Sequence, residues 1–285
     1  MSLDRTLAQA QDLADRLPPL LVAAERVAAS LAGGAHGRRR PGQGETFWQY
    51  RRAQPGDSAA AIDWRRSARG PGLFVRETEW AAAQSLWLWA DGSASMDWRS
   101  RDDLPTKGER ARLLTLALAA LLLRGGERVA ALDAETPPSC GPGTLTRLAE
   151  HLLAAGPAAT PLPRPRRLPH HGEVVLVSDF LLPLDQIEAE VAAIAAHGNG
   201  GHLLQVLDPA EESLPYAGRV RFLGLEGEGE VLAHRAEDWR DEYRLRLGRH
   251  RDALAAIAAA RGWSFASHRT DLPPQLALPR RSGWA

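Results

Sequence analysis

The stretch Ser-Leu-Trp-Leu-Trp-Ala-Asp-Gly-Ser-Ala-Ser-Met, residues 85–96, decides the fold class of this 285-residue chain. It begins with an apolar run and changes abruptly at Asp91 to small polar residues. A short apolar run is typical of a strand that is buried on both faces, as strands of parallel sheets are. The pattern therefore predicts a polar loop, Asp91 to Ser95, at the carboxyl end of a buried strand.

Helical and strand patterns alternate after this stretch. The spacing predicts helices over 107–123, 145–155, 184–197 and 238–260, and strands over 128–132, 173–177, 202–207 and 263–267. Strands that alternate with helices indicate βαβ units and a parallel sheet. We therefore predict an α/β fold with a doubly wound, mostly parallel sheet.

The part of the chain before this α/β region has a different character. Leu and Ala recur at helical spacing near the N-terminus, with a break or kink expected at Pro18-Pro19. Strands predicted at 47–52 and 73–80 are expected to form a small β-rich annex, which a hairpin at 218–234 is a candidate to join. The expected domains are an N-terminal helical segment (1–36), a Trp- and Arg-rich annex (37–80) and an α/β domain (81–285).

Composition and charge exclude several classes of function. The formal net charge is zero, so no global charge favours nucleic acid or an anionic membrane. The longest strongly apolar run, residues 113–123, is shorter than the roughly 20 residues that span a bilayer, and no signal segment opens the chain. The single cysteine, Cys140, cannot form an internal disulfide. We expect a cytoplasmic protein without membrane insertion and without nucleic-acid binding.

Three predicted strands end in an acid: Asp91, Asp179 and Asp208. The carboxyl ends of strands form the ligand-binding edge of an open α/β sheet. Carboxylate and hydroxyl oxygens suit Mg²⁺ or Mn²⁺, and the Asp-x-Ser-x-Ser alternation puts three such groups on one side of a tight loop. The same residue types are also ordinary turn and capping residues, so a structural role is the alternative. Hydroxyls at the predicted edge belong to Ser93, Ser95, Thr144, Thr146 and Ser178.

Two sets of motifs resemble known families. Asp91-Gly92-Ser93-Ala94-Ser95-Met96 after an apolar strand resembles the metal-ion-dependent adhesion site of von Willebrand factor A domains. The stretches GETFWQYR (44–51), PGD (55–57) and IDWRRSAR (62–69) are similar to a bacterial family catalogued as domain of unknown function family fifty-eight. The likeness covers roughly residues 37–278, and the long, unusual IDWRRSAR stretch is its most specific part.

This resemblance implies a von Willebrand factor A-like fold and a partner, because such proteins are commonly encoded beside MoxR-type AAA ATPases and are regarded as their adaptors. It also implies site residues by position. Asp91, Ser93 and Ser95 would form the first metal-binding loop. Thr144, or alternatively Thr146, would supply the hydroxyl of the second loop, although Gly141-Pro142-Gly143-Thr144 departs from a decisive motif. Asp179 would be the acid of the third loop.

The function implied is capture of a protein rather than catalysis. Mg²⁺ keeps water in some of its coordination positions, and a Glu or Asp of a partner can replace one of them. The metal then bridges two proteins. The expected partners are a MoxR-type AAA ATPase and its client protein, in protein maturation or in metal or cofactor insertion.

A second candidate partner-binding surface is rich in Trp and Arg. Trp is enriched at interface hot spots, whereas core packing is the alternative for these aromatic residues. The neighbouring Asp57 and Asp63 favour a structural ion-pair network for the arginines. The run Arg38 to Arg40 is a weaker candidate for binding phosphate, given the neutral chain. The candidate partner-binding residues are Trp48, Arg51, Trp64, Arg65 and Arg69.

Two alternatives to the metal-dependent adaptor remain. One is a Mg²⁺-dependent phosphohydrolase with Asp91 as nucleophile, although such enzymes usually carry a second Asp where this chain has Ser93. The chain contains neither a Walker A pattern nor Gly-x-Ser-x-Gly, so we expect no enzyme activity. The other alternative is a metal-free scaffold that binds through the Trp/Arg surface. The pair His170-His171 lacks the partners of a zinc site.

Overall fold

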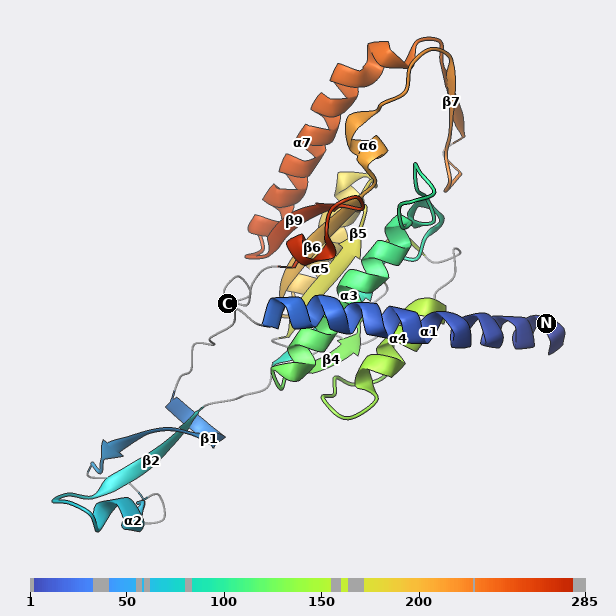
Figure 1. Ribbon diagram of the computed structural model, residues 1–285. Coiled ribbons are helices and arrows are strands. Elements are labelled where there is room, and N and C mark those ends of the chain that lie inside the picture. Colours follow the sequence, from blue (N-terminus) through green and yellow to red (C-terminus); the bar gives the residue numbers. More distant parts are fainter. Residues whose placement is uncertain are drawn as a thin grey trace. The chain divides into compact units, whose positions relative to one another are not determined.

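The computed structural model describes residues 3–32, 41–54, 58, 62–79, 84–154, 160–163, 172–227 and 229–278. The chain folds as two compact units (Figure 1). The larger unit comprises Met1–Gly33 and Gln84–Arg280, and it contains the main sheet. The smaller unit comprises Gly34–Ala83 and Arg281–Ala285.

A five-stranded parallel sheet forms the centre of the larger unit. Its strands lie in the order β4-β3-β5-β6-β9, and each neighbouring pair is parallel. The predicted α/β class with a mostly parallel sheet is therefore confirmed. The strands are β3 (Ser85–Ala90), β4 (Arg128–Ala131), β5 (Glu173–Ser178), β6 (Gly200–Leu207) and β9 (Ser264–Arg269).

The order of the strands reverses in the middle of the sheet. From β3 the chain moves outward to β4, and it then returns to the other side of β3 to form β5, β6 and β9 in turn. Ligands of open α/β sheets bind at such a reversal, beyond the carboxyl ends of the two strands that flank it. The topology therefore marks the loops after β3 and β5 as the place to look for a site.

Strands β3 and β5 are central because their side chains are apolar on both faces. All but the first residue of each strand is buried. Trp87 and Trp89 pack in the main core cluster, with Leu176 and the ring of Trp263. Gly201 allows the close approach of that ring, because a Cβ at this position would lie 2.5 Å from it.

Helices cover both faces of the sheet. On one face α3 (Lys107–Arg124) packs beside α4 (Thr144–Ala154), and α1 (Leu3–Ala32) crosses both of them (Figure 1). Pro18 and Pro19 lie inside α1, which the structure assigns as one helix. On the other face α5 (Leu184–Ala195) contacts α7 (Arg240–Ala259), and both contribute to the core cluster.

Short elements follow β6 and surround the carboxyl edge of the sheet. Helix α6 (Pro209–Ser213) comes directly after β6, and strands β7 (Val220–Leu223) and β8 (Glu230–Ala233) form a two-stranded hairpin. The hairpin belongs to the larger unit (Figure 1), and residues of α6 and of β7 line the same cavity. The 3-10 helices are η2 (Ala94–Met96), η3 (Ala236–Trp239) and η4 (Pro274–Leu276). Within the described part of the chain, no helix has the length and apolar character needed to span a bilayer.

The smaller unit contains an antiparallel pair and one short helix. Strands β1 (Pro41–Arg52) and β2 (Phe74–Glu79) pair with two register shifts. Helix α2 (Trp64–Ser67) begins at Asp63, whose carboxylate accepts hydrogen bonds from the Arg66 N–H at 2.8 Å and the Tyr50 hydroxyl at 3.1 Å. The Ile-Asp-Trp-Arg motif thus includes the residue that caps this helix.

Candidate metal site at the carboxyl edge of the sheet

The candidate site lies where β3 and β5 end, at the reversal of the strand order. Asp91 follows β3 directly, Ser178 is the last residue of β5, and Asp179 follows it. The N–H of Asp91 donates to the carbonyl oxygen of Val177 at 2.8 Å, so the two strand ends are joined by a ladder hydrogen bond. The local strand pairing thus places the two predicted acids side by side.

Asp91 is a buried carboxylate that is held by neutral donors. Its Oδ1 accepts from the Ser93 N–H at 2.8 Å, and its Oδ2 accepts from the Ser178 hydroxyl at 2.7 Å. The side chain is 1% exposed. Burial raises the pKa of Asp91 to about 6. The hydrogen bonds from Ser178 and Ser93 lower this pKa, and the charge of Asp179 raises it slightly, but burial has the largest effect. The Asp91 anion would therefore be stabilised by a cation.

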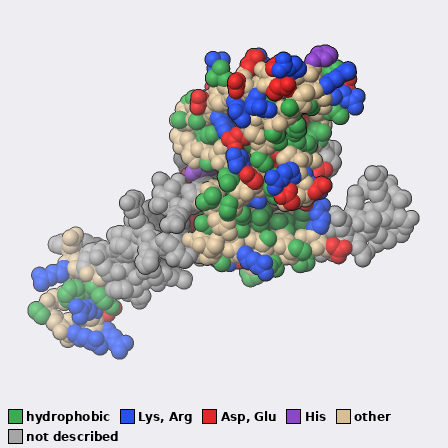
Figure 2. Space-filling model, turned by 45° about the horizontal axis from the view of Figure 1, so that its top comes forward, with side chains coloured by type: hydrophobic (Ala, Val, Ile, Leu, Met, Phe, Trp, Pro, Cys, Tyr) green, Lys and Arg blue, Asp and Glu red, His purple; other side chains and the backbone are tan. Residues whose placement is uncertain are grey.

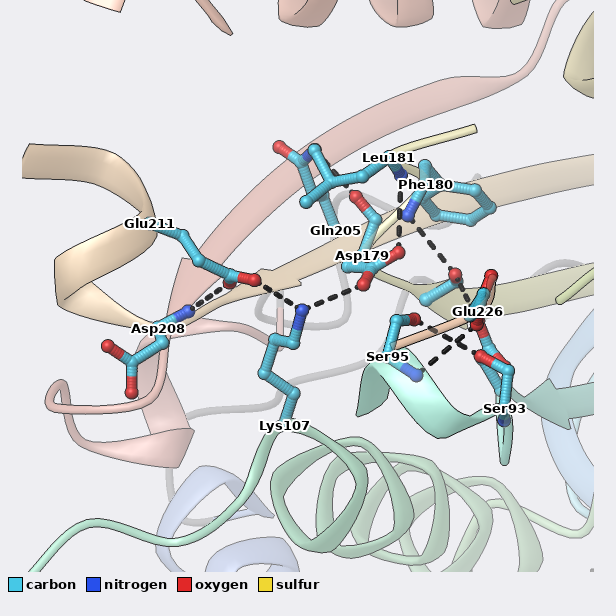
Figure 3. A network of polar contacts seen from close by, with 12 residues as sticks. Ser93, Ser95, Lys107, Asp179, Phe180, Leu181, Gln205, Asp208, Glu211 and Glu226 are labelled. Atoms are coloured by element: carbon cyan, nitrogen blue, oxygen red, sulfur yellow. Dashed lines mark hydrogen bonds and ion pairs between the residues drawn. The ribbon is translucent and has the colours of Figure 1, made fainter. Parts of the chain in front are cut away.

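Ser93 and Ser95 lie with Asp91 on one tight turn. The two hydroxyl oxygens are 3.2 Å apart, and Ser93 is 2% exposed. Ser93 precedes η2, which turns the chain so that both hydroxyls approach the same point (Figure 3). The structure thus brings together one carboxylate and two hydroxyls from the Asp-x-Ser-x-Ser stretch.

Asp179 has a different environment, because it already has a cationic partner. The Lys107 ammonium lies 2.8 Å from Oδ2 of Asp179 and 2.5 Å from Oε1 of Glu211 (Figure 3). Lys107 is 1% exposed. Its burial opposes ionisation, but the charges of the two carboxylates outweigh that effect and raise the pKa of Lys107. A buried ammonium between two carboxylates thus occupies the side of Asp179 that faces α6.

Sequence reasoning missed Lys107 as a member of this site. Lys107 and Asp179 are 72 residues apart, and no local motif connects them. The one signal was compositional, because Lys107 is the single lysine among 35 basic residues. Its position is set by a capping box, in which Thr106 and Glu109 exchange backbone and side-chain hydrogen bonds at the start of α3.

The loop after β5 is held rigidly. The Asp179 Oδ1 accepts from the Leu181 N–H at 3.1 Å, and the Asp179 carbonyl accepts from Gln205 Nε2 at 2.8 Å. Phe180 has a φ of 49°, in the left-handed region that a bulky residue rarely adopts. Its N–H donates to the Ser178 hydroxyl at 3.1 Å. The strained turn fixes the direction in which Asp179 points.

Asp208, the third strand-ending acid, has a structural role. Its Oδ1 accepts from the Ala210 N–H at 2.8 Å and caps α6, while its Oδ2 accepts from the Ser100 N–H at 2.9 Å. Its own N–H donates to Glu211 Oε2 at 2.9 Å. Burial raises the pKa of Glu211, although Lys107 opposes this shift. The capping box of α6 thereby positions Glu211 against Lys107.

Thr144 is buried at the start of α4, but its hydroxyl is used locally. It donates to the Gly141 carbonyl at 2.8 Å, and it lies 2.8 Å from the Ser139 hydroxyl and 3.0 Å from Nη2 of Arg147. Thr146 is half-buried on the same helix. The hydrogen bonds of the described residues do not connect either threonine with Asp91. In that described part, no group of three or more His, Cys, Asp or Glu side chains is arranged to hold a metal. A metal site here would depend on hydroxyl ligands.

The predicted Trp/Arg surface falls in the smaller unit. Trp64 is 60% exposed, and Arg65 and Arg69 are exposed as well. The side chains of Trp48 and Arg51 lie outside the described part of the chain. So do Arg38 to Arg40, Asp57 and the His170-His171 pair. Three of the five predicted residues, Trp64, Arg65 and Arg69, are therefore accessible in the structure.

A cavity of about 570 Å³ adjoins the candidate metal site. One wall is polar and includes Ser95, Lys107, Asp179 and Glu211, and another is formed by residues 220–226 of the hairpin. At the boundary of the two walls, the N–H of Ser95 donates to Oε1 of Glu226 at 3.2 Å (Figure 3).

The charges around this cavity have a small negative excess. Three carboxylates, those of Asp179, Glu211 and Glu226, line it together with the ammonium of Lys107 and the guanidinium of Arg221, and the buried carboxylate of Asp91 belongs to the adjoining loop. A divalent cation would offset part of the remaining negative charge. On the molecular face shown in Figure 2, by contrast, basic and acidic side chains are interspersed. The described residues of that face form no extended basic patch of the kind expected of a nucleic-acid interface.

Comparison with known proteins gives the family. The chain is 29% identical over 250 residues to uncharacterized proteins of Mycobacterium bovis and of Mycobacterium tuberculosis, which covers 81% of this chain and 76% of each relative. No solved structure matches the chain significantly. The family model described as "Protein of unknown function DUF58" matches residues 49–253, as the motifs between residues 44 and 69 predicted. The chain therefore belongs to the DUF58 family of proteins of unknown function.

Proposed function

We propose that this protein is a non-catalytic adaptor with a von Willebrand factor A-like fold, which binds a partner protein through a metal-ion-dependent adhesion-type site. One observation carries the proposal. The buried carboxylate of Asp91 is held by neutral donors beside the hydroxyls of Ser93 and Ser95, at the reversal of strand order in a parallel sheet. This donor set and this place in the topology favour a hard divalent cation.

The ion would be Mg²⁺ or Mn²⁺, held by Asp91, Ser93 and Ser95. When bound, it would supply an electrophilic position for a carboxylate of the partner. Asp179 contributes negative charge close by, while its carboxylate remains paired with Lys107. Thr144 would take no part, because its hydroxyl is engaged at the start of α4. The site thus differs from the three-loop arrangement that the sequence resemblance implied.

The partner that the family resemblance supports is a MoxR-type AAA ATPase in the cytoplasm, together with a client protein. The cavity beside Ser95 is a recess next to the metal loop, where a segment of the partner would bind. The adaptor would present the client to the ATPase for maturation or for insertion of a metal or cofactor.

The two alternatives have weaker support. A phosphohydrolase with Asp91 as nucleophile usually has a second acid two residues on as general acid, and Ser93 stands at that position. A metal-free scaffold is favoured by the 60% exposure of Trp64 in the smaller unit. If the protein is such a scaffold, a chelator should not affect its binding to a partner.

Calorimetric titration with Mg²⁺ and Mn²⁺ tests the proposal. Wild type should bind one ion saturably, and Asp91→Asn should abolish that binding. Asp97→Asn is the matched control, because Asp97 is an exposed acid close to the same loop. A co-expressed AAA ATPase should be retained by wild type and released by a chelator. A wild-type protein that binds neither ion would refute the metal site, and chelator-resistant retention would favour the scaffold.

A further inference from the structure

The turn of the β7–β8 hairpin reaches the candidate metal site. The Ser95 N–H donates to Oε1 of Glu226, which comes 131 residues later in the chain. Ser95 belongs to the loop that receives the carboxylate of a partner in the proposed function. A carboxylate of the chain itself therefore already contacts that loop (Figure 3).

The cavity beside this contact is polar on one side and apolar on the other. Lys107, Asp179 and Glu211 contribute the charged groups of the polar side, and Arg221 and Glu226 are the charged residues of the hairpin that line the cavity. The apolar lining comes largely from the hairpin and from the segments after β5 and α6, and it includes Val220, Phe222, Leu225, Leu181 and Leu214. A segment that fits this cavity therefore needs a polar end that faces the metal loop and an apolar side chain next to it. Glu226 and its neighbour Leu225 have this combination.

The hairpin is held firmly at its base and weakly at its turn. At the base, the Ala236 N–H donates to the Gly218 carbonyl at 2.9 Å, and within the paired strands the Phe222 ring stacks on Trp239 with centroids 6.3 Å apart. Its two strands have four residues each and pair with each other in a sheet of their own. Leu223 and Val231 are 60% and 54% exposed. A two-stranded hairpin of this kind has little intrinsic stability, so its turn can move while its base stays in place.

We propose that residues 225–227 are an internal ligand of the site, and that the partner segment which displaces them has the same chemistry, an Asp or Glu next to a large apolar side chain. The hairpin then competes with the partner for the Ser95 N–H and for the cavity. The proposal rests on the proposed function for the role of the site in partner binding. It does not require the metal, because the Ser95 N–H and the cavity wall belong to the protein.

A peptide copy of the turn tests this competition. The probe is a fluorescent peptide of residues 221–231, Arg-Phe-Leu-Gly-Leu-Glu-Gly-Glu-Gly-Glu-Val, and its binding to the full chain is measured by anisotropy with Mg²⁺ and with chelator. In Glu226→Gln the internal carboxylate is lost, so the peptide should bind about tenfold or more tightly than to wild type. Glu230→Gln is the matched control, because Glu230 is on the same hairpin and pairs with Arg221 at 3.8 Å. It should bind the peptide as wild type does.

Two further measurements make the result specific. A peptide with Gln in place of the residue equivalent to Glu226 should bind weakly to all variants. Hydrogen exchange at the Ser95 amide should be faster in Glu226→Gln than in wild type, and the unmodified peptide should slow it again. Circular dichroism checks that both chain variants fold, as the exposure of Glu226 and Glu230 leads us to expect.

The outcomes distinguish this proposal from the proposed function. Equal peptide affinities of Glu226→Gln and wild type, with unchanged exchange at Ser95, would overturn the internal ligand. If Mg²⁺ binds while the affinities stay equal, only the internal ligand fails. If neither Mg²⁺ nor Mn²⁺ binds but Glu226→Gln still tightens peptide binding, the internal ligand is supported and the metal-dependent function fails.

Discussion

Two acids at the same edge of the sheet have opposite electrostatic environments. Asp91, after β3, is buried among neutral donors, and its pKa is raised to about 6. Asp179, after β5, pairs with the buried ammonium of Lys107, which Glu211 shares. The charge of Asp179 is therefore compensated within the protein, whereas that of Asp91 is not. This difference indicates that an added metal cation would bind at the Asp91 loop, because Asp179 is already paired with the ammonium of Lys107.

Lys107→Met should have the largest effect on stability, because it removes the cation that distinguishes Asp179 from Asp91. It leaves Asp179 and Glu211 buried without their cation, so we expect the free energy of unfolding to fall by about 3–5 kcal/mol. Urea denaturation followed by tryptophan fluorescence at pH 7 measures it. Arg124→Met is the control, because Arg124 pairs with Glu25 on the exposed surface and should contribute less than about 1 kcal/mol. A loss below 1 kcal/mol in Lys107→Met would mean that the ammonium is not essential to Asp179.

A third kind of buried group is the imidazole of His268, a base that the fold keeps neutral. It should influence how the free energy of unfolding depends on pH. Burial and the neighbouring Arg110 lower the pKa of His268 to about 4. Below its ordinary pKa of 6.5 the unfolded chain takes up a proton that the folded chain refuses, so stability falls as pH drops from 6.5 through 4. We expect His268 to account for about 2–3 kcal/mol of that loss.

His268→Gln isolates this contribution. The Gln carbonyl can still accept from Arg110, whose Nη1 lies 3.0 Å from His268 Nε2. Thermal unfolding of the variant between pH 7 and pH 4 should therefore depend less steeply on pH than that of wild type. Parallel pH profiles for the two proteins would show that His268 is protonated in the folded state.

Ser95→Ala and Thr144→Val sharpen the assignment of the ligands. The first removes a hydroxyl from the Asp91 loop and should weaken Mg²⁺ binding about tenfold, equivalent to about 1.4 kcal/mol. The second removes the hydroxyl that donates to the Gly141 carbonyl, and it should leave the Mg²⁺ affinity unchanged. Calorimetry measures the Mg²⁺ affinity of both variants. Weaker Mg²⁺ binding by Thr144→Val would indicate that Thr144 is a ligand, as in the three-loop arrangement.

Asp91→Asn should have the smallest effect on stability. The amide keeps the shape of the side chain and removes a buried anion, so we expect a gain of up to about 1 kcal/mol in the free energy of unfolding at pH 7 without metal. Urea denaturation in chelator measures it beside Lys107→Met. A large loss of stability would show that the folded chain stabilises the Asp91 anion, through its hydrogen-bond donors or through a cation, by more than burial of the charge costs.

The features that depend on neighbouring residues could be predicted from the amino-acid sequence. The apolar run before Asp91 was enough to predict a buried strand, because burial on both faces needs apolar side chains at every position. The turn that joins Asp91, Ser93 and Ser95 was predictable for the same reason, since its members are two residues apart. The alternation of helices and strands gave the parallel sheet. The motifs between residues 44 and 69 predicted the family that the comparison confirmed.

The contacts between residues that are distant in the sequence became known from the folded structure. Lys107 reaches Asp179 and Glu211 over 72 and 104 residues, and Glu226 reaches Ser95 over 131, through contacts that no local pattern encodes. These pairs form because the strand order brings loops from distant segments to one edge of the sheet. Thr144, chosen by position, shows the converse: a nearby carbonyl and hydroxyl satisfy its side chain at the start of α4.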